Sequence, residues 1–406
     1  HAAYSYEQTE TAANVDEDII DPLTGGRLVG SVTSFENFAE CPLRYYLRYG
    51  VDLKEREEFT FSPVNFGVVL HAVIREVCDE IKKNGESYYL ISEEKRREMV
   101  KRSVAAITDI YQNSILKDSS RNSFMIKRME DLADRTIWAM GEQLKCGDFV
   151  PFVFEHKFNM EVGDGDRKQL MSGTIDRVDI CENGTDVYVR IIDYKTGKKD
   201  FNIVKTYYGI DIQLMVYMEA AMKLVAKMRP GKNVIPAGVF YYNISDPIVS
   251  ATTESAEEIE DKIKGELRLK GMVNSDKDIV EKMDNTEGTS LNIPVSRKAD
   301  GGFDSRRSKV MNTEQFNMLG RFVDVRAVDT ADRIAGGDIR RSPYKDGQFS
   351  SCDRCPYGAV CGFSVDLPGC NYRKLKKFDD EVLWNNIKEG IDENGKKMDT
   401  GAEECD

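Results

Sequence analysis

The sequence predicts an α+β fold, in which a mixed β-sheet is flanked by helices. Three observations support this prediction. Apolar residues recur at helical spacing over 66–81, and the spacing changes to alternation after residue 152. A second helical pattern over 207–227 separates the alternating segments from a final strand pattern at 235–244. The order helix, three strands, helix, strand indicates one core built from both kinds of element.

The composition is that of a globular protein with enough apolar residues for a sizeable core. Of the 406 residues, 41% are hydrophobic and 31% are charged. No apolar run reaches the roughly 18 residues of a membrane span. The net charge is −13, but acidic residues gather at both ends of the chain while basic clusters lie between them. Net charge therefore does not exclude binding to nucleic acid.

The chain is expected to hold one main domain, at 31–365, between two charged end segments. Residues 1–30 predict a loose acidic segment and 366–406 a charged tail. The main domain is divided into a helical insertion at about 85–148, a core at about 150–245, a helical part at about 250–340 and a cysteine loop at 350–361. The first residue is His1 rather than Met, which suggests a fragment, and no secretory signal is present. Nine cysteines in such a chain indicate a reducing compartment, the cytoplasm.

Two helical segments are expected before the sheet begins. Thr33 and Glu36 have the spacing of a capping box, so a short helix should start there. Pro42 suits the first turn of a second segment and leaves Cys41 at the junction. The following helix buries one stripe and carries His71 beside it; the stripe is Phe66, Leu70, Val73, Val77 and Ile81.

Charged residues interrupt two strands that are otherwise dominated by Val, Ile and Tyr, in "SGTIDRVDICENGTDVYVRIIDYKTG" at 172–197. Asn183-Gly184 is a strong hairpin signal. If these two residues form the turn, Asp176 faces Ile191, and Asp193 and Lys195 share the same face of the sheet. The two carboxylates are then a diagonal pair about 7–8 Å apart, within reach of one ion. The carbonyl of Tyr194 lies close by.

Two carboxylates, a carbonyl and a nearby ammonium suit Mg²⁺ or Mn²⁺. A cation held by Asp176 and Asp193 can polarise a phosphodiester and lower the pKa of water. Lys195 can orient that water or offset charge developing on the phosphate. The alternative is a solvated hairpin face with an ordinary salt bridge.

These motifs resemble the PD-(D/E)XK nuclease superfamily, and in particular its RecB-like branch. "GTIDRVD" resembles the motif that carries the first acid, Asp176, and "IIDYKTG" the motif with Asp193 and Lys195. "QLMVY" resembles the helix of that branch in which Gln213 and Tyr217 share one face. "GVVLH" resembles its upstream helix, where the resemblance implies that His71 is a metal ligand. Taken singly, His71, Gln213 and Tyr217 are ordinary helix residues.

The resemblance implies a restriction-endonuclease-like α/β core and a catalytic set formed by Asp176, Asp193, Lys195, Gln213 and Tyr217. It implies that His71, Asp176, Asp193 and the Tyr194 carbonyl hold Mg²⁺. Basic residues beside these motifs are candidates for DNA contact; they are Arg177, Lys198 and Lys199.

The cysteines indicate a second metal centre. Cys352, Cys355 and Cys361 lie within ten residues in "CDRCPYGAVC", a spacing that favours one shared metal. "CPLRYYLRYG" at Cys41 resembles a segment of iron–sulfur nucleases, in which one early cysteine joins three late ones around a 4Fe–4S cluster. Zn²⁺ is the alternative that spacing leaves open. The centre would close a loop of about 310 residues around the core.

Residues 30–365 resemble the C-terminal nuclease domain of the AddB family, which belongs to the bacterial AddAB helicase–nucleases. The resemblance implies Mg²⁺-dependent cleavage of single-stranded DNA ends in double-strand-break repair, on the 5′-ended strand, with an AddA-type partner. The family's long helicase-like region is absent from this sequence. Three alternatives stay open: an exonuclease of CRISPR adaptation with a similar cluster, a non-catalytic DNA-binding module, and an iron–sulfur redox protein.

Overall fold

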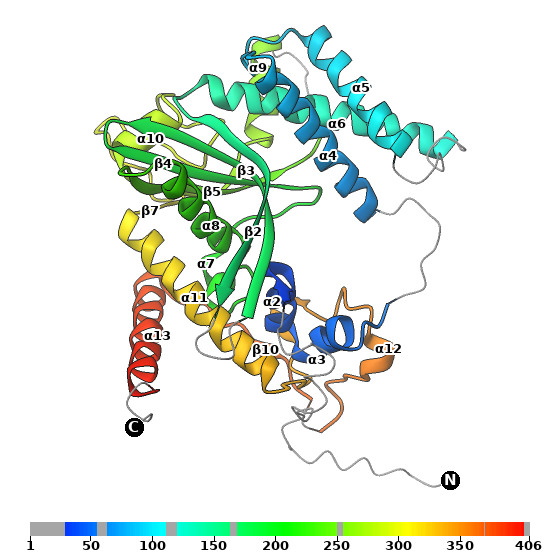
Figure 1. The fold of residues 1–406 in the computed structure, drawn as a ribbon, viewed down its shortest axis with the longest axis vertical. Coiled ribbons are helices and arrows are strands. Elements are labelled where there is room, and N and C mark those ends of the chain that lie inside the picture. The colour runs from blue at the N-terminus through cyan, green and yellow to red at the C-terminus, as the bar shows by residue number, and fades with distance from the viewer. Residues whose placement is uncertain are drawn as a thin grey trace.

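The fold is a seven-stranded mixed sheet with helices on both faces (Figure 1). A computed structural model describes residues 29–54, 63–110, 120–162, 169–249, 255–368 and 370–401. The strand order is β1-β3-β4-β5-β6-β7, with β2 paired to the other edge of β3. The strands are β1 (Val29–Ser31), β2 (Val150–Val162), β3 (Gln169–Asn183), β4 (Asp186–Lys195), β5 (Asn233–Asn243), β6 (Lys270–Asn274) and β7 (Val310–Met311). The predicted α+β architecture is confirmed.

Two apolar cores lie on opposite faces of the sheet. On one face α4 (Pro63–Lys83), α5 (Glu93–Ile110) and α6 (Ser120–Lys145) cover the strands. All five residues of the predicted stripe on α4 are buried, and each such side chain contributes about 1.5–3 kcal/mol on removal from water. On the other face lie α8 (Gln213–Met228), α11 (Thr313–Ala335) and α13 (Asp380–Gly401).

The hairpin between β3 and β4 turns at Gly184 and Thr185, one residue later than predicted. Asn183 pairs with Asp186, so opposing residue numbers sum to 369 rather than 367. Gly184 adopts φ 60°, which glycine tolerates. Two-residue turns with a positive φ only at the first central position prefer glycine at that position, so the turn is formed by Gly184 and Thr185. Because the error is two positions in the sum, every side chain keeps its predicted face. The ladder ends at the pair Arg177–Ile192, and the same register continued by one residue sets Asp176 opposite Asp193 rather than diagonal to it.

Helix α8 makes the crossover between the parallel strands β4 and β5. The short helix α7 (Ile203–Tyr207) precedes it. The region after β5, predicted as helical with polar loops, contains α9 (Ala256–Glu266) and α10 (Lys277–Met283) but also supplies the strands β6 and β7.

The structure describes only part of the two predicted end segments. Residues 1–28 lie outside the described residues. Within the predicted tail, α13 packs Leu383 and Ile387 into the core against α11, because these residues are one helical turn apart. No helix of the described residues is both long enough and apolar enough to cross a bilayer.

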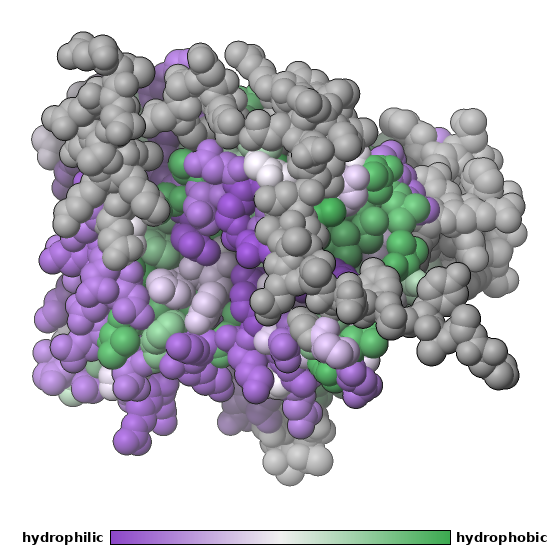
Figure 2. All heavy atoms as spheres, turned by 90° about the horizontal axis from the view of Figure 1, so that it is seen from below, coloured by the Kyte–Doolittle hydropathy of each residue, from purple (hydrophilic) through white to green (hydrophobic). Residues whose placement is uncertain are grey.

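The early and late parts of the chain meet at the cysteine-bearing end of the molecule. Here α2 (Val32–Glu40), α3 (Pro42–Tyr45) and the π-helix η1 (Tyr46–Gly50) lie against a small sheet and α12 (Gly358–Cys361). The small sheet comprises β8 (Tyr344–Asp346), β9 (Phe349–Ser350) and β10 (Arg373–Lys374). Figure 2 shows the molecule from below, where most of the visible coloured surface is hydrophilic and apolar residues lie among it.

The predicted capping box at Thr33 and Glu36 is wrong. Ser31 caps α2, because its hydroxyl oxygen accepts the backbone N–H of Ser34 at 3.2 Å. Glu36 instead points away from its own helix to a distant one. The prediction that Pro42 opens a second helix after Cys41 is confirmed.

Candidate active site

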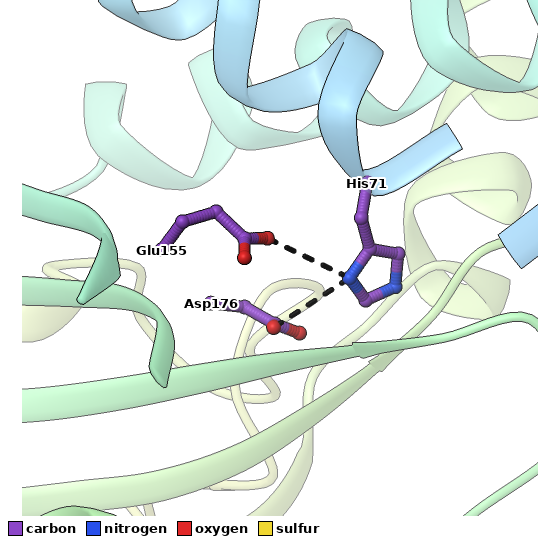
Figure 3. A group of neighbouring side chains, drawn as sticks. All are labelled: His71, Glu155 and Asp176. Atoms are coloured by element: carbon purple, nitrogen blue, oxygen red, sulfur yellow. Dashed lines mark ion pairs between the residues drawn. The ribbon is translucent and has the colours of Figure 1, made fainter. Parts of the chain in front are cut away.

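Three ligand-type side chains converge between α4 and the strands β2 and β3 (Figure 3). The Nδ1 atom of His71 lies 3.5 Å from Asp176 Oδ1 and 3.8 Å from Glu155 Oε1. The ligand atoms of the three residues all lie within 4.8 Å of one another. Among the described residues, no other group of three meets that criterion. Burial lowers the pKa of His71, but the two carboxylates outweigh burial and raise it to about 10. The site therefore has a strongly negative potential.

The strand pair β2–β3 is irregular where it supplies the two carboxylates. The ladder pairs Phe154 with Arg177 and His156 with Ile175, but Glu155 and Asp176 between them are not paired. Glu155 has φ 48°, a left-handed conformation that costs a residue with a side chain of order 1–3 kcal/mol. Local irregularity of this kind re-aims side chains, and here it turns both carboxylates toward His71.

Glu155 was missed by the sequence analysis. Its signal resembles the one that identified Asp176, because it is an acid within an apolar strand, "FVFEHKF". The alternation of that strand places Glu155 on a definite face, but the irregular backbone at this position is invisible in the sequence.

Asp193, Lys195, Gln213 and Tyr217 form a continuous chain of polar contacts beside the metal-ligand group. Lys195 Nζ lies 2.6 Å from Asp193 Oδ2 and donates to Gln213 Oε1 at 3.0 Å. The Gln213 amide in turn donates to the Tyr217 hydroxyl at 2.9 Å. Burial, together with the charge of Asp176, raises the pKa of Asp193 to about 7. The structure thus brings together all five residues of the predicted catalytic set.

Tyr194 connects the two halves of the site. Its backbone N–H donates to Asp176 Oδ2 at 2.6 Å, and its ring lies edge-on to His71. Its side chain points to the opposite face of the sheet from Lys195, as predicted, and is buried.

The prediction that Arg177 contacts DNA is wrong. Arg177 is 1% exposed and donates two hydrogen bonds to Asp179, at 2.7 and 2.6 Å, because it points into the core beneath α4. Lys199 is paired with Asp211 at 3.0 Å. Of the three candidates, Lys198 alone presents an exposed ammonium group.

A hollow of about 490 Å³ lies beside Tyr217, lined by parts of β2 and β3 and by the start of α2. Its described lining contains one cation, Lys157, two aromatic rings, Phe158 and Tyr217, and no carboxylate. A side chain at Gly173 would approach the Phe158 ring to 2.7 Å, so glycine is needed to leave the two rings in their edge-on contact.

The four predicted cysteines line one small hollow at the C-terminal end of α2. It brings Cys41 together with Cys352, Cys355 and Cys361, among apolar neighbours that include Leu43, Leu47 and Phe363. Burial raises the pKa of the Cys41, Cys352 and Cys361 thiols. Cys78 and Cys181 are buried elsewhere, as expected of small core residues.

Hydrogen bonds hold the two cysteine-bearing segments together. The Leu43 N–H donates to the Arg340 carbonyl at 3.2 Å, and the Tyr357 hydroxyl donates to the Leu53 carbonyl at 2.9 Å. The junction between the segment at Cys41 and the segment at 352–361, called the clasp below, is therefore held in part by hydrogen bonds that need no metal.

Comparison with known proteins identifies the family. A family model described as the PD-(D/E)XK nuclease superfamily matches residues 30–362. Curated relatives are named as subunits of an ATP-dependent helicase/deoxyribonuclease. They include proteins of Lachnoclostridium phytofermentans, 34% identical over 98% of this chain, and Clostridium acetobutylicum, 34% identical over 97%. A third, from Thermoanaerobacter sp. (strain X514), is 33% identical over 91%.

The matched regions make up 35%, 34% and 33% of those three relatives, so the chain spans about a third of the length of the curated relatives it matches. The predicted resemblance to the AddB family is confirmed by these relatives. The chain belongs to the PD-(D/E)XK nuclease superfamily.

Proposed function

We propose that this chain is a metal-dependent deoxyribonuclease that shortens single-stranded DNA from an end, on the 5′-ended strand. It would act in double-strand-break repair in the bacterial cytoplasm, together with an AddA-type helicase–nuclease partner. The observation that carries the proposal is the contact chain from Asp193 through Lys195 and Gln213 to Tyr217, beside His71, Glu155 and Asp176.

The donor set fits a hard divalent cation. His71, Glu155 and Asp176 offer one nitrogen and two carboxylates in a compact group, and the buried Asp193 lies next to them. When bound there, Mg²⁺ or Mn²⁺ polarises the phosphodiester and lowers the pKa of water. The Tyr194 N–H holds Asp176 in place, so this carboxylate is pre-oriented for its role.

Lys195 is the catalytic lysine of this proposal. Asp193 and Gln213 fix its ammonium group from two sides, so it can orient the attacking water and offset charge on the phosphate. Tyr217 fixes Gln213 in turn, which makes the two helix residues supports for the lysine.

The hollow beside Tyr217 suits a single strand better than a duplex. Rings for stacking, uncharged hydroxyl groups and one cation are the features with which proteins hold single-stranded nucleic acid. A volume of about 490 Å³ is large enough for about one nucleotide. Lys198 is exposed and is a further candidate for contact with the DNA backbone.

We propose that Cys41, Cys352, Cys355 and Cys361 hold a 4Fe–4S cluster that stabilises the clasp. A single Zn²⁺ with Zn–S bonds of about 2.3 Å would bring four sulfurs within about 3.8 Å of one another. Among the described residues these thiols are not a group with all atoms within 4.8 Å, although they line one hollow. The resemblance to iron–sulfur nucleases favours a cluster, whose cysteines bind different irons.

The nuclease proposal is tested with end-labelled single-stranded DNA and protein purified without oxygen. Cleavage with Mg²⁺ and none with EDTA is expected, and Lys195→Ala should abolish it. Lys227→Ala is the matched control, because this exposed lysine lies at the far end of α8. Labels on each end report polarity. A folded wild-type protein that binds the DNA but cuts nothing with either metal would instead indicate a DNA-binding module.

The cluster is tested by iron and sulfide analysis and by visible absorption of the anaerobic protein. Cys352→Ser should remove the absorption band, whereas Cys181→Ser, at a buried cysteine outside the hollow, should keep it. Stoichiometric zinc without iron would refute the cluster in favour of the alternative metal.

A further inference from the structure

Helix α8 carries Gln213 as its first residue, and its start is not capped by its own segment. The N-cap residue is Ile212, which has no polar side chain, yet the first N–H groups of a helix need acceptors. The missing acceptor comes from α2. Glu36 Oε1 accepts the N–H of Ile212 at 2.9 Å and the N–H of Gln213 at 3.0 Å.

A carboxylate at this position fits the physics of a helix start. The N-terminus of a helix carries partial positive charge, so an anion there stabilises it and fixes where the helix begins. Burial of its carboxyl raises the pKa of Glu36 to about 7, while the neighbouring Lys199 opposes that rise. Lys199 is itself held by Asp211, so the carboxylate has a fixed, charged neighbourhood.

The residue fixed by Glu36 is the one that fixes the lysine. Gln213 receives Glu36 on its backbone N–H and Lys195 on its side-chain oxygen. A shift of the first turn of α8 therefore moves the acceptor of the Lys195 ammonium group directly. Small displacements of such groups are costly to catalysis, because reaction rates depend steeply on alignment.

Helix α2 also ends at the cysteine centre. Four residues after Glu36 the helix stops at Glu40, and Cys41 follows in an extended conformation. The Glu40 carbonyl accepts the hydroxyl of Ser351, the neighbour of Cys352, at 3.4 Å. One short, rigid helix thus spans from the cysteine-lined hollow to the first turn of α8.

We propose that Glu36 is a positioning residue, which sets the start of α8 and thereby holds Gln213 and Lys195 in their working arrangement. Through α2 it connects the cysteine centre to the catalytic lysine. This inference rests on the proposed nuclease function, and its test includes a measurement that does not depend on cleavage.

The test compares Glu36→Ala, which removes the acceptor, with Glu36→Gln, whose amide oxygen can accept the same two N–H groups. Glu40→Ala is the matched control, because Glu40 lies on the same helix and pairs with Arg44 rather than with α8. Assays run at roughly pH 8.5, above the pKa of Glu36. Kinetic constants are measured with single-stranded DNA and Mg²⁺, and affinity is measured in EDTA.

Glu36→Ala is expected to lower kcat on the order of tenfold to a hundredfold, with KM and DNA affinity within about threefold of wild type. Glu36→Gln should recover most of the loss, and Glu40→Ala should keep full activity. An unchanged kcat in Glu36→Ala, or a Glu36→Gln variant as impaired as Glu36→Ala, would overturn the proposal.

Hydrogen exchange separates this inference from the nuclease assignment. Peptides covering 209–218 should exchange faster in Glu36→Ala than in wild type or Glu40→Ala, whether or not the protein cleaves DNA. Equal exchange at the start of α8 would overturn the positioning role by itself. An inactive wild type with the expected exchange pattern would refute the nuclease function alone.

Discussion

Replacing Asp179 with asparagine tests the buried charge network beneath the site. Asp179 is fully buried between two arginines, each 1% exposed. Arg177 donates to both carboxylate oxygens, at 2.7 and 2.6 Å, and Arg190 Nε donates at 2.8 Å. Burial opposes ionisation of Asp179, but the two arginines outweigh it and hold the pKa of Asp179 below its usual value. Asparagine keeps the shape and one acceptor but removes the charge.

The expected loss is large because two buried guanidinium groups would lose the carboxylate that they share. Removing one partner of a buried ion pair costs about 3–5 kcal/mol. An exposed pair is worth only about 0–1 kcal/mol. Glu182 lies on the same strand and accepts from Arg229 at the same distance, 2.8 Å, but its side chain is 44% exposed. Glu182→Gln is therefore a matched control that differs mainly in burial.

The assay is urea unfolding of each variant, followed by fluorescence and circular dichroism. Asp179→Asn should lose about 3–5 kcal/mol of unfolding free energy, and Glu182→Gln about 1 kcal/mol or less. If Asp179→Asn does not fold, replacing the whole network with Arg177→Met, Asp179→Leu and Arg190→Met should restore folding, since an apolar core needs no counter-charge. Equal, small losses in both single variants would refute the reasoning.

Three further predictions concern the metal site, the contact chain and the ion pairs of Asp338. Glu155→Gln should weaken Mn²⁺ binding in calorimetry at least about tenfold and reduce cleavage. Glu161→Gln, at an exposed residue on the same strand, should change neither. If Glu155→Gln bound Mn²⁺ as tightly as the wild type, Glu155 would not be a ligand. Tyr217→Phe deletes the hydroxyl that accepts from Gln213, so kcat should fall about twofold to tenfold, the value of one hydrogen bond, with DNA affinity retained. Burial favours the neutral form of Asp338, but Arg333 and Arg340 outweigh burial and lower its pKa from 3.8 to about 2. Asp338 therefore contributes about 2 kcal/mol to the free energy of unfolding above pH 4, and this contribution is lost as the pH falls to about 2. Asp338→Asn should therefore destabilise the protein at pH 7 but not near pH 2; a pH-independent difference in unfolding free energy would contradict this.

Local sequence patterns were sufficient to predict the helices and strands of the core and the face of the sheet on which Asp176, Asp193 and Lys195 lie. Side chains alternate every two residues in a strand and recur every three to four in a helix, so Asp193 and Lys195, or Gln213 and Tyr217, share a face whatever the tertiary structure. The hairpin register was predicted wrongly, yet the predicted faces held because the error preserved that alternation. The family resemblance depended on the same local motifs.

Which charged groups lie in contact depends on long-range packing. The backbone at Glu155 departs from a regular strand, and no local sequence pattern predicts this departure. Arg177 and Lys198 look alike as basic residues near the motifs, but one is buried against Asp179 and the other is exposed. Glu36 has the spacing to cap its own helix and instead caps α8, 176 residues away. Sequence patterns indicate which nearby groups a polar side chain can bond to. A buried polar group needs a partner, and long-range packing decides which group takes that place.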